Sequence, residues 1–153
     1  MSIAKSFADL RVYAAAFEAA GRVCDLSLHF PREERFALTD QVRRSSRAVC
    51  AMISEAWGRR RYRAVFINKL DEAIGEAHET QAWLEFARHH SYLVESDFQH
   101  LHETYQTLGA QLNRMIDRAD DFCKFASDTD YRSIVREESD EFFQSPITSH
   151  QSP

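Results

Sequence analysis

The chain has 153 residues, of which 44% are apolar, with only four glycines, three prolines and a net charge of −5. This length suits one domain with a substantial core, and the scarcity of turn-forming residues favours long helices over many short strands. The longest apolar run, residues 12–17, is far shorter than the roughly 20 apolar residues of a transmembrane helix. The first residues lack the apolar core of a signal peptide, and three widely spaced cysteines are typical of reduced thiols. We therefore expect a cytoplasmic protein.

Apolar residues that alternate between spacings of three and four predict two helices in the first part of the chain. The first predicted stripe is Phe7, Leu10, Ala14, Phe17, Gly21, Cys24 and Leu28. This helix should end before Pro31, because proline disfavours a helical conformation in the residue before it. The second stripe is Leu38, Val42, Ser45, Val49, Met52 or Ile53, and Ala56. Gly58 is its predicted end, since glycine tolerates the left-handed conformation common there.

Two further stripes predict a third and a fourth helix. The third stripe is Phe66, Leu70, Ala73, Ala77, Thr80, Leu84 and Ala87. The fourth is Phe98, Leu101, Tyr105, Leu108, Leu112, Met115, Ala119 and Phe122, and the sequence from Ser96 to Gln99 has the pattern of a capping box. Four such helices with short connections predict an all-α fold, an antiparallel up-down-up-down four-helix bundle.

The third predicted helix has a broader apolar face than a narrow seam requires. The residues that widen it are Ile67, Ile74, Trp83 and Phe86. Such a face can bury more than one neighbour, either inside the bundle or in another subunit, and the sequence leaves both alternatives open.

The apolar pattern decays after the fourth stripe. We assign residues 1–126 to the helical bundle domain and residues 127–153 to an acidic C-terminal tail. A short helix over residues 131–143 is the most structure that this tail should form, and the Ser- and Pro-containing end should be disordered.

The charge of the chain is distributed very unevenly. Nine of the 19 Lys and Arg residues lie in the segment 32–63, which has only four acidic residues and a net charge of +5. The segments 64–118 and 119–153 each carry −5. An acidic protein that concentrates its cations on one element is expected to bind an anionic partner there.

Several motifs resemble the four-helix-bundle family encoded in intervening sequences of bacterial 23S ribosomal RNA genes. They include Phe30-Pro31, the segment from Glu33 to Arg44 and the Tyr92-Leu93 pair, and the resemblance covers residues 6–120. The family has glycine where this chain has Ser91. Members of that family are small bundles that assemble as homopentamers, mostly without an assigned activity, so the resemblance implies a homopentamer. A related bundle, the accessory protein of diversity-generating retroelements, binds nucleic acid beside a reverse transcriptase. The resemblance thus implies an accessory protein with RNA or DNA and a reverse transcriptase or another ribonucleoprotein component as partners.

Three arginines of the second helix, Arg43, Arg44 and Arg47, are candidate nucleic-acid-binding residues. Guanidinium groups match phosphate oxygens in bidentate geometry, so clustered arginines suit a phosphate backbone. The alternative is that these arginines form salt bridges with the acidic third helix. The acidic residues in question are Asp71, Glu72, Glu76 and Glu79.

The segment that follows the second helix is the other candidate region. Its binding residues are predicted to be Trp57, Arg59, Arg60, Arg61, Tyr62 and Arg63. Aromatic rings can stack on unpaired bases while arginines hold phosphates. The alternative is that Trp57 covers the core and the arginines only solubilise a turn. Glu55 should pair with Arg59 one turn away.

No motif in the sequence points to catalysis. His89, His90, His100 and His102 surround the third turn, but without a Glu-x-x-His motif they do not indicate a di-iron core. We therefore predict no catalytic residues, no metal and no cofactor. The favoured function is a non-catalytic, oligomeric nucleic-acid-binding accessory protein, with RNA favoured over duplex DNA. The alternative is a homo-oligomeric scaffold that binds an acidic protein partner and no nucleic acid.

Overall fold

The chain divides into two units, Met1–Cys123 and Lys124–Pro153. The computed structural model describes residues 4–124, which are the first unit from Ala4 onward and the one residue after it. Every regular element in this part of the chain is helical, so the predicted all-α class is confirmed. The predicted tail, residues 127–153 with a helix over 131–143, lies outside the described residues.

Four long helices make up the described part of the chain. They are α1 (Arg11–Ser27), α2 (Asp40–Gly58), α3 (Arg63–His89) and α4 (Glu95–Asp117). A short α5 (Ala119–Phe122) follows α4, while η1 (Phe7–Asp9) precedes α1, and η2 (Arg32–Glu34) and η3 (Arg35–Thr39) lead into α2. None of the described helices is long and apolar enough to cross a bilayer.

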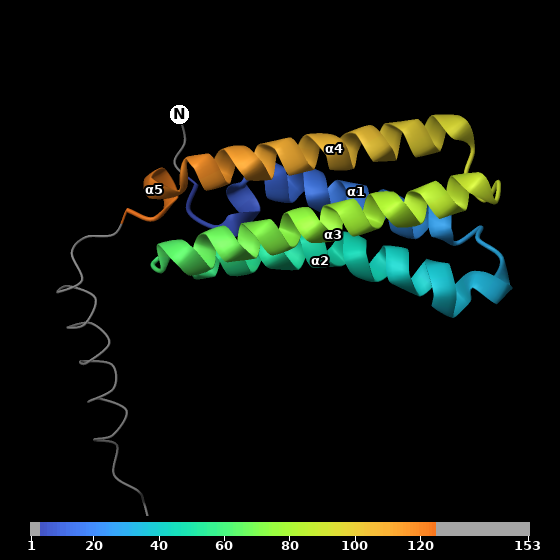
Figure 1. The fold of residues 1–153 in the computed structure, drawn as a ribbon, viewed down its shortest axis with the longest axis horizontal. Helices are drawn as coiled ribbons and strands as arrows, with labels where there is room; N and C mark the ends of the chain where they lie inside the picture. The colour runs from blue at the N-terminus through green and yellow to red at the C-terminus, as the bar shows by residue number, and fades with distance from the viewer. Residues whose placement is uncertain (1–3, 125–153) are drawn as a thin grey trace, which may run out of the picture. The chain divides into compact units, whose positions relative to one another are not determined.

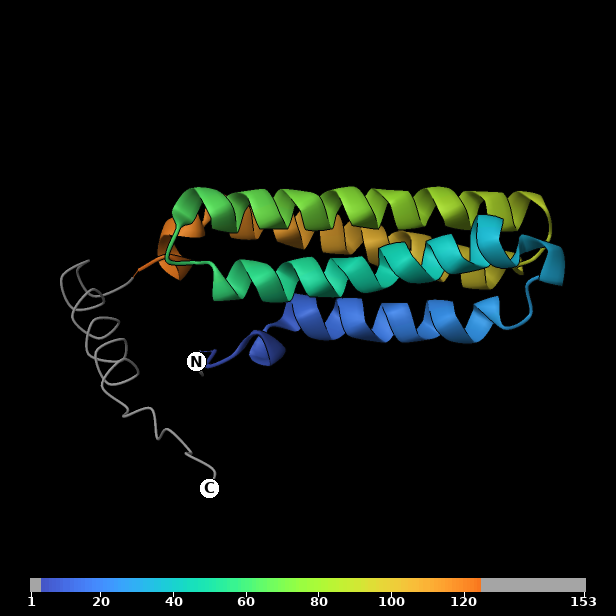
Figure 2. The ribbon, with the colours of Figure 1, turned by 90° about the horizontal axis from the view of Figure 1, so that it is seen from below.

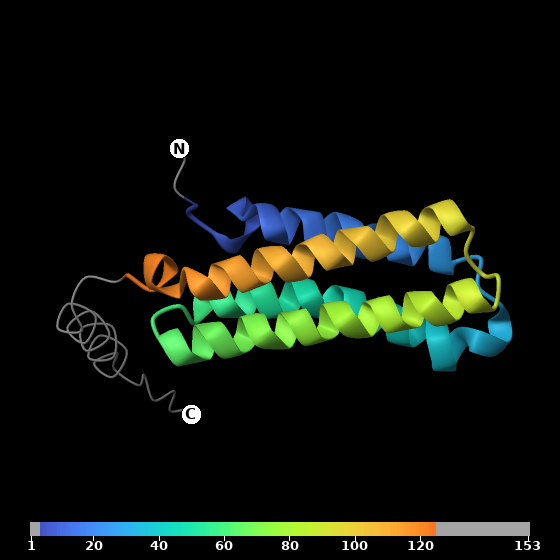
Figure 3. The ribbon, with the colours of Figure 1, turned by 45° about the horizontal axis from the view of Figure 1, so that its top comes forward.

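The four long helices lie side by side around one core. Each long helix contacts two others, in the pairs α1 and α2, α2 and α3, α3 and α4, and α1 and α4. Figures 1 and 3 show α1 and α4 in one layer and α2 and α3 in the other. In Figure 2 the chain runs along α1, returns along α2, runs out again along α3 and returns along α4. The α2–α3 connection therefore lies at the same end as α5.

Helices α2, α3 and α4 bury the stripes that the sequence predicts. All seven predicted residues of α3 are buried, from Phe66 to Ala87. In α2, Ile53 is fully buried and Met52 is half-buried, which resolves the choice between them. The α4 stripe is buried from Phe98 to Leu112, and Met115 packs against the edge of the core.

Helix α1 buries a different face from the predicted one. Its buried residues are Val12, Ala16, Ala19, Ala20, Val23 and Ser27. Of the predicted stripe, Phe17 is 65% and Leu28 69% exposed. Both rows have helical spacing, but the row of small residues allows α1 to approach its neighbours closely, and the bulkier row is left outside. The predicted face of the first helix is therefore wrong.

The helix ends also differ in part from expectation. Helix α2 does end at Gly58, but no glycine of the described residues has a positive φ, so the left-handed conformation is not the cause. The predicted capping box at Ser96 is wrong, because α4 begins at Glu95 with Val94 as its cap. The left-handed residue is Ser91, with φ of 60°, in the turn between α3 and α4.

Candidate nucleic-acid interface

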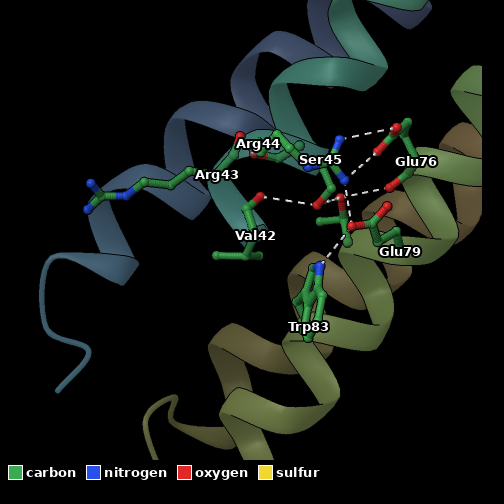
Figure 4. Close-up of polar contacts among 9 residues, drawn as sticks. Val42, Arg43, Arg44, Ser45, Glu76, Glu79 and Trp83 are labelled. Carbon is green, nitrogen blue, oxygen red and sulfur yellow. Dashed lines mark hydrogen bonds and ion pairs between the residues drawn. The ribbon is translucent and has the colours of Figure 1, made fainter. Parts of the chain in front are cut away.

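The arginines of α2 lie on two opposite flanks of the helix. In Figure 4 the side chain of Arg44 reaches towards α3, whereas that of Arg43 points away from it. This division follows from helix geometry, since adjacent residues are separated by about 100° around the axis. The three arginines that are close in sequence therefore do not form one cluster.

On the α3 flank, the positive charge of Arg44 is offset by two carboxylates. Its Nη2 lies 3.2 Å from Glu76 Oε2 and 2.5 Å from Glu79 Oε1. Trp83 Nε1 donates a hydrogen bond to the same Glu79 oxygen at 3.1 Å (Figure 4). The hydrogen bond that Arg44 donates to Glu79 holds the pKa of the Glu79 carboxyl below its usual value, and the same bond raises the pKa of Arg44. The salt-bridge alternative thus applies to Arg44.

A buried polar contact lies beside this ion-pair cluster. Thr80 Oγ1 is 2.8 Å from Ser45 Oγ and 2.9 Å from the carbonyl oxygen of Glu76. Both side chains are fully buried. Because a buried hydroxyl is costly without a partner, this pair ties α2 to α3 in one register.

On the α1 flank, Arg43 and Arg47 contact neutral groups. Arg43 Nε donates to Ser27 Oγ at 2.7 Å, and Ser27 Oγ donates to the carbonyl oxygen of Cys24 at 2.9 Å. Arg47 Nη2 lies 3.8 Å from Cys24 Sγ. Neither arginine forms an ion pair within residues 4–124. The predicted alternative, pairing with the acids of α3, is therefore wrong for these two residues, which retain uncompensated charge.

The segment after α2 is partly engaged in contacts of its own. The Arg60 guanidinium lies 3.7 Å from the centre of the Trp57 ring, and Nη1 donates to the Trp57 carbonyl oxygen at 2.7 Å. Burial lowers the pKa of Arg60. One face of Trp57 is thus covered, so a base could not stack on that face without displacing Arg60.

The remaining side chains of this segment are more accessible. Arg59 is exposed, Arg61 is half-buried and Tyr62 is 54% exposed. Arg63 Nε lies 2.6 Å from Asp120 Oδ1, but both side chains are more than half exposed. Such an exposed pair contributes only about 0–1 kcal/mol to the stability of the folded protein. A phosphate could therefore replace the carboxylate of Asp120 as the partner of Arg63.

The predicted pair of Glu55 with Arg59 is wrong. Glu55 Oε2 instead lies 3.0 Å from Lys69 Nζ on α3, and the same ammonium is 2.9 Å from Glu72 Oε2. The hydrogen bonds to Glu72 and then Glu55 raise the pKa of Lys69. Arg59 consequently has no carboxylate partner among the described residues.

The structure thus separates the basic stretch into two regions. Arg43 and Arg59 are 16 positions apart, which corresponds to about 24 Å along a helix. The Arg43 and Arg47 side chains lie against α1, whereas Arg59 to Arg63 lie at the α2–α3 connection (Figure 2).

The histidines around the α3–α4 turn make ring contacts rather than a metal centre. His89 and His90 have ring centres 5.2 Å apart, and His90 stacks on Tyr92. His102 Nε2 is 3.4 Å from Glu85 Oε1. Within residues 4–124, no three histidine, cysteine, aspartate or glutamate side chains are grouped so that they could hold a metal ion.

A group of three aromatic side chains on η1 and α1, of which Phe7 and Phe17 are exposed and Tyr13 is half-buried, is a surface feature that the predicted stripe missed. The Phe7 and Tyr13 rings meet edge to face with centres 4.9 Å apart, and the Tyr13 and Phe17 rings stack with centres 6.1 Å apart. The sequence does contain a sign of this arrangement, because Val12, Ala16 and Val23 form a second apolar row with helical spacing on the same helix.

The fold and the divided arginines define a small, all-helical protein with a basic second helix. The family model of the 23S rRNA-intervening sequence protein matches residues 8–114, and the chain belongs to this family. The predicted family resemblance is thereby confirmed.

One solved structure similar to this chain comes from Bacteroides thetaiotaomicron and is described as a protein with unknown function from the S23 ribosomal protein family. It is 30% identical, its alignment covers 69% of this chain and 95% of that chain, and the TM-score is 0.63. None of the curated proteins compared with the chain matches it.

Proposed function

We propose that this protein is a non-catalytic nucleic-acid-binding accessory protein whose four long helices form an antiparallel up-down-up-down bundle. The observation that carries this proposal is a group of arginines in the segment 32–63 that have no carboxylate partner among the described residues. They are Arg32, Arg35, Arg43, Arg47 and Arg59. All five belong to the one positively charged stretch of an otherwise acidic chain.

Phosphate is the anion that this arrangement suits best. Arginine binds phosphate oxygens through paired N–H donors, and a protein with a net charge of −5 needs a local excess of cations to approach a polyanion. Tyr62, 54% exposed beside Arg61 and Arg63, offers a ring on which an unpaired base can stack. RNA with single-stranded segments is therefore favoured over duplex DNA.

The direct test is a binding titration with fluorescein-labelled RNA of mixed sequence. Wild-type protein should bind at low salt, and the affinity should fall with salt with a slope of about 0.7 for each phosphate contact on a single strand. Replacing Arg59 and Arg63 with Gln should flatten that slope, while Arg60 is left in place because it covers Trp57.

The matched control for this titration removes two arginines that already have carboxylate partners. Arg22 pairs with Asp97 at 2.8 Å, and Arg44 pairs with Glu76 and Glu79. The Arg22→Gln, Arg44→Gln variant has the same net charge as the Arg59→Gln, Arg63→Gln variant, and its salt slope should equal that of the wild type. If wild-type protein does not bind mixed RNA or DNA at low salt, the proposal fails.

The alternative function is a homo-oligomeric scaffold for an acidic protein partner, and one surface favours self-association. Phe86 is 54% exposed and Trp83 half-buried beside a hollow of about 130 Å³ that Ala37 also lines. A cyclic ring buries such faces without leaving open ends, and we propose five subunits. Light scattering that reports a monomer at micromolar concentration would contradict the oligomer.

We also propose that the nucleic acid belongs to a ribonucleoprotein that contains a reverse transcriptase. This step rests on the resemblance to retroelement accessory proteins. Co-purification of RNA with the protein after a high-salt wash, followed by sequencing of that RNA, tests it. RNA derived from unrelated abundant transcripts would contradict it.

A further inference from the structure

The outer surface where α1 and α2 meet combines arginines with the exposed ring of Phe17 and the half-buried ring of Tyr13. We define the α1–α2 face as Arg43, Arg47, Tyr13 and Phe17. Arg43 is anchored through Nε to Ser27 Oγ at 2.7 Å, and Arg47 reaches Cys24 Sγ at 3.8 Å. Arg47 therefore lies against the row of α1 that carries Phe17 and Cys24, whereas Arg43 is held at Ser27 on the neighbouring buried row.

Helix geometry relates the arginines to the rings. Phe17 and Cys24 are seven positions apart, which is about two turns, so they share one side of α1 with about 10 Å between them along the axis. The Phe17 ring is 65% exposed and stacks on Tyr13 with an angle of 29° between the planes. The result is a supported flat ring about two turns of α1 from Cys24, the residue that Arg47 contacts.

The charge of this face is mainly positive. The α1 row is formed by Leu10, Tyr13, Ala14, Phe17, Gly21, Cys24 and Leu28, and it contains no carboxylate. The adjoining row of α2 is formed by Asp40, Arg43, Ser46, Arg47, Cys50 and Ser54, in which Asp40, at the start of the helix, is the one carboxylate. The contacts of Arg43 and Arg47 orient their side chains while leaving their charge uncompensated, which is the opposite of the situation at Arg44.

We infer that the α1–α2 face binds an unpaired nucleic-acid strand, with Arg43 and Arg47 on successive phosphates and a base stacked on Phe17. Residues four apart on a helix are about 6 Å apart along its axis, which allows the two arginines to contact different phosphates. A ring on a rigid helix can reach a splayed base but not a base inside a duplex. This inference rests on the proposed function and assigns it a second binding surface.

The test compares the labelled mixed-sequence RNA strand with the same strand annealed to its complement. Arg43→Gln with Arg47→Gln should lower the affinity for the single strand on the order of tenfold at low salt and reduce the salt slope by about 1.4. Phe17→Ala should weaken single-strand binding about fivefold to tenfold and leave duplex binding unchanged. The Arg22→Gln, Arg44→Gln variant should bind as the wild type does.

A single Arg47→Gln variant guards against an effect on folding, because Arg47 is exposed and its one hydrogen-bond partner among residues 4–124 is Cys24. Its salt slope should fall by about half as much as that of the double variant, while its thermal unfolding matches that of the wild type. The inference would be overturned if Phe17→Ala lost the same affinity for the single strand and for the duplex. It would also be overturned if poly-glutamate at equal charge concentration displaced the RNA fully, a result that would point to an acidic peptide.

The outcomes separate this inference from the proposed function. If binding is lost in Arg59→Gln, Arg63→Gln but retained in Arg43→Gln, Arg47→Gln, the inference fails and the proposed function stands. If the reverse holds, the α1–α2 face is the site and the α2–α3 connection is not. If wild-type protein binds neither strand nor duplex, both fail.

Discussion

Helix α2 meets α3 and α1 in two very different ways. Towards α3 it presents Arg44 to two carboxylates and Ser45 to the buried hydroxyl of Thr80. Towards α1 it presents Arg43 and Arg47 to a hydroxyl and a thiol. One helix thus carries arginines whose charge is offset on one flank and uncompensated on the other.

Because the arginines on the two flanks have different partners, a count of basic residues does not measure the positive charge available to a ligand. The acids of α3 that lie within reach of α2 decide which arginines are neutralised, and α1 has no acid in the corresponding row. The packing of the two interfaces differs as well. Large side chains such as Phe66, Leu70 and Leu84 fill the α3 side of the core, whereas the buried side chains of α1 are no larger than valine.

The largest expected effect is the loss of a large side chain on the α3 side. Leu70 is fully buried, so Leu70→Ala should lower the free energy of unfolding by about 2–5 kcal/mol, through lost transfer energy and the cavity left behind. Urea denaturation followed by circular dichroism measures this. A loss below about 1 kcal/mol would mean that α3 does not pack as described.

On the α1 side, the expected damage comes from adding volume rather than removing it. Ala16 is fully buried where α1 approaches its neighbours, and Ala16→Leu should cost about 1–3 kcal/mol by overpacking. The matched control is Ala14→Leu on the exposed row, which should change the stability by less than about 0.5 kcal/mol. The reverse order of these two effects would restore the face predicted from the stripe of Phe17.

A smaller effect is expected for the ion pair on the α3 flank. Glu79→Gln keeps an acceptor for Trp83 and removes the charge opposite Arg44, so it should cost about 0.2–1 kcal/mol near neutral pH. The pKa of Glu79 is lower in the folded protein than its usual 4.5. The stabilisation is therefore present above about pH 4.5 and is lost as the pH falls through the lower, folded-state value.

Chemical denaturation of wild type and Glu79→Gln at several pH values between 3 and 7 checks that sign. The difference between the two proteins should shrink towards acid. The Arg44→Gln variant should behave in the same way, because it removes the other partner of the pair. A difference that grows on acidification would rule out the ion pair as the cause.

The smallest effect is expected at the turn between α3 and α4. Ser91 has φ of 60°, and the turn is closed by hydrogen bonds from the Ser91 amide to Arg88 at 2.9 Å and from the Tyr92 amide to Ala87 at 2.8 Å. A left-handed conformation costs a non-glycine residue about 1–2 kcal/mol, partly offset by the entropy that glycine loses on folding. Ser91→Gly should thus stabilise the protein by about 0.5 kcal/mol, whereas Ser91→Val should destabilise it. Thermal unfolding of both variants provides the measurement.

Sequence periodicity identified the long helices and three of the four buried faces. It succeeded for α3 because only one row of that helix is apolar along its whole length, from Phe66 to Ala87. It failed for α1, where an alanine-rich row and an aromatic row share the same spacing. The aromatic row was predicted to be buried because its side chains are larger and more apolar. The fold buries the row of small residues instead, because small side chains allow neighbouring helices to approach closely.

The candidate site was predictable only as a set of residues. The sequence showed that Arg43, Arg44 and Arg47 are near one another, but which partner each one meets depends on side chains that are distant in the chain, Ser27 and Glu79 among them. The engagement of Trp57 by Arg60 is local and could have been anticipated from their spacing of three positions.

The most direct test compares two single substitutions on the opposite flanks of α2. Arg44→Gln and Arg47→Gln are three positions apart, change the net charge equally and leave the core intact. The affinity of each purified variant for the labelled single-stranded RNA should be measured at low salt. If the α1–α2 face binds the strand, Arg47→Gln should weaken binding several-fold and lower the salt slope by about 0.7, while Arg44→Gln should bind as the wild type does. Equal affinities for both variants, or a larger loss for Arg44→Gln, would contradict it.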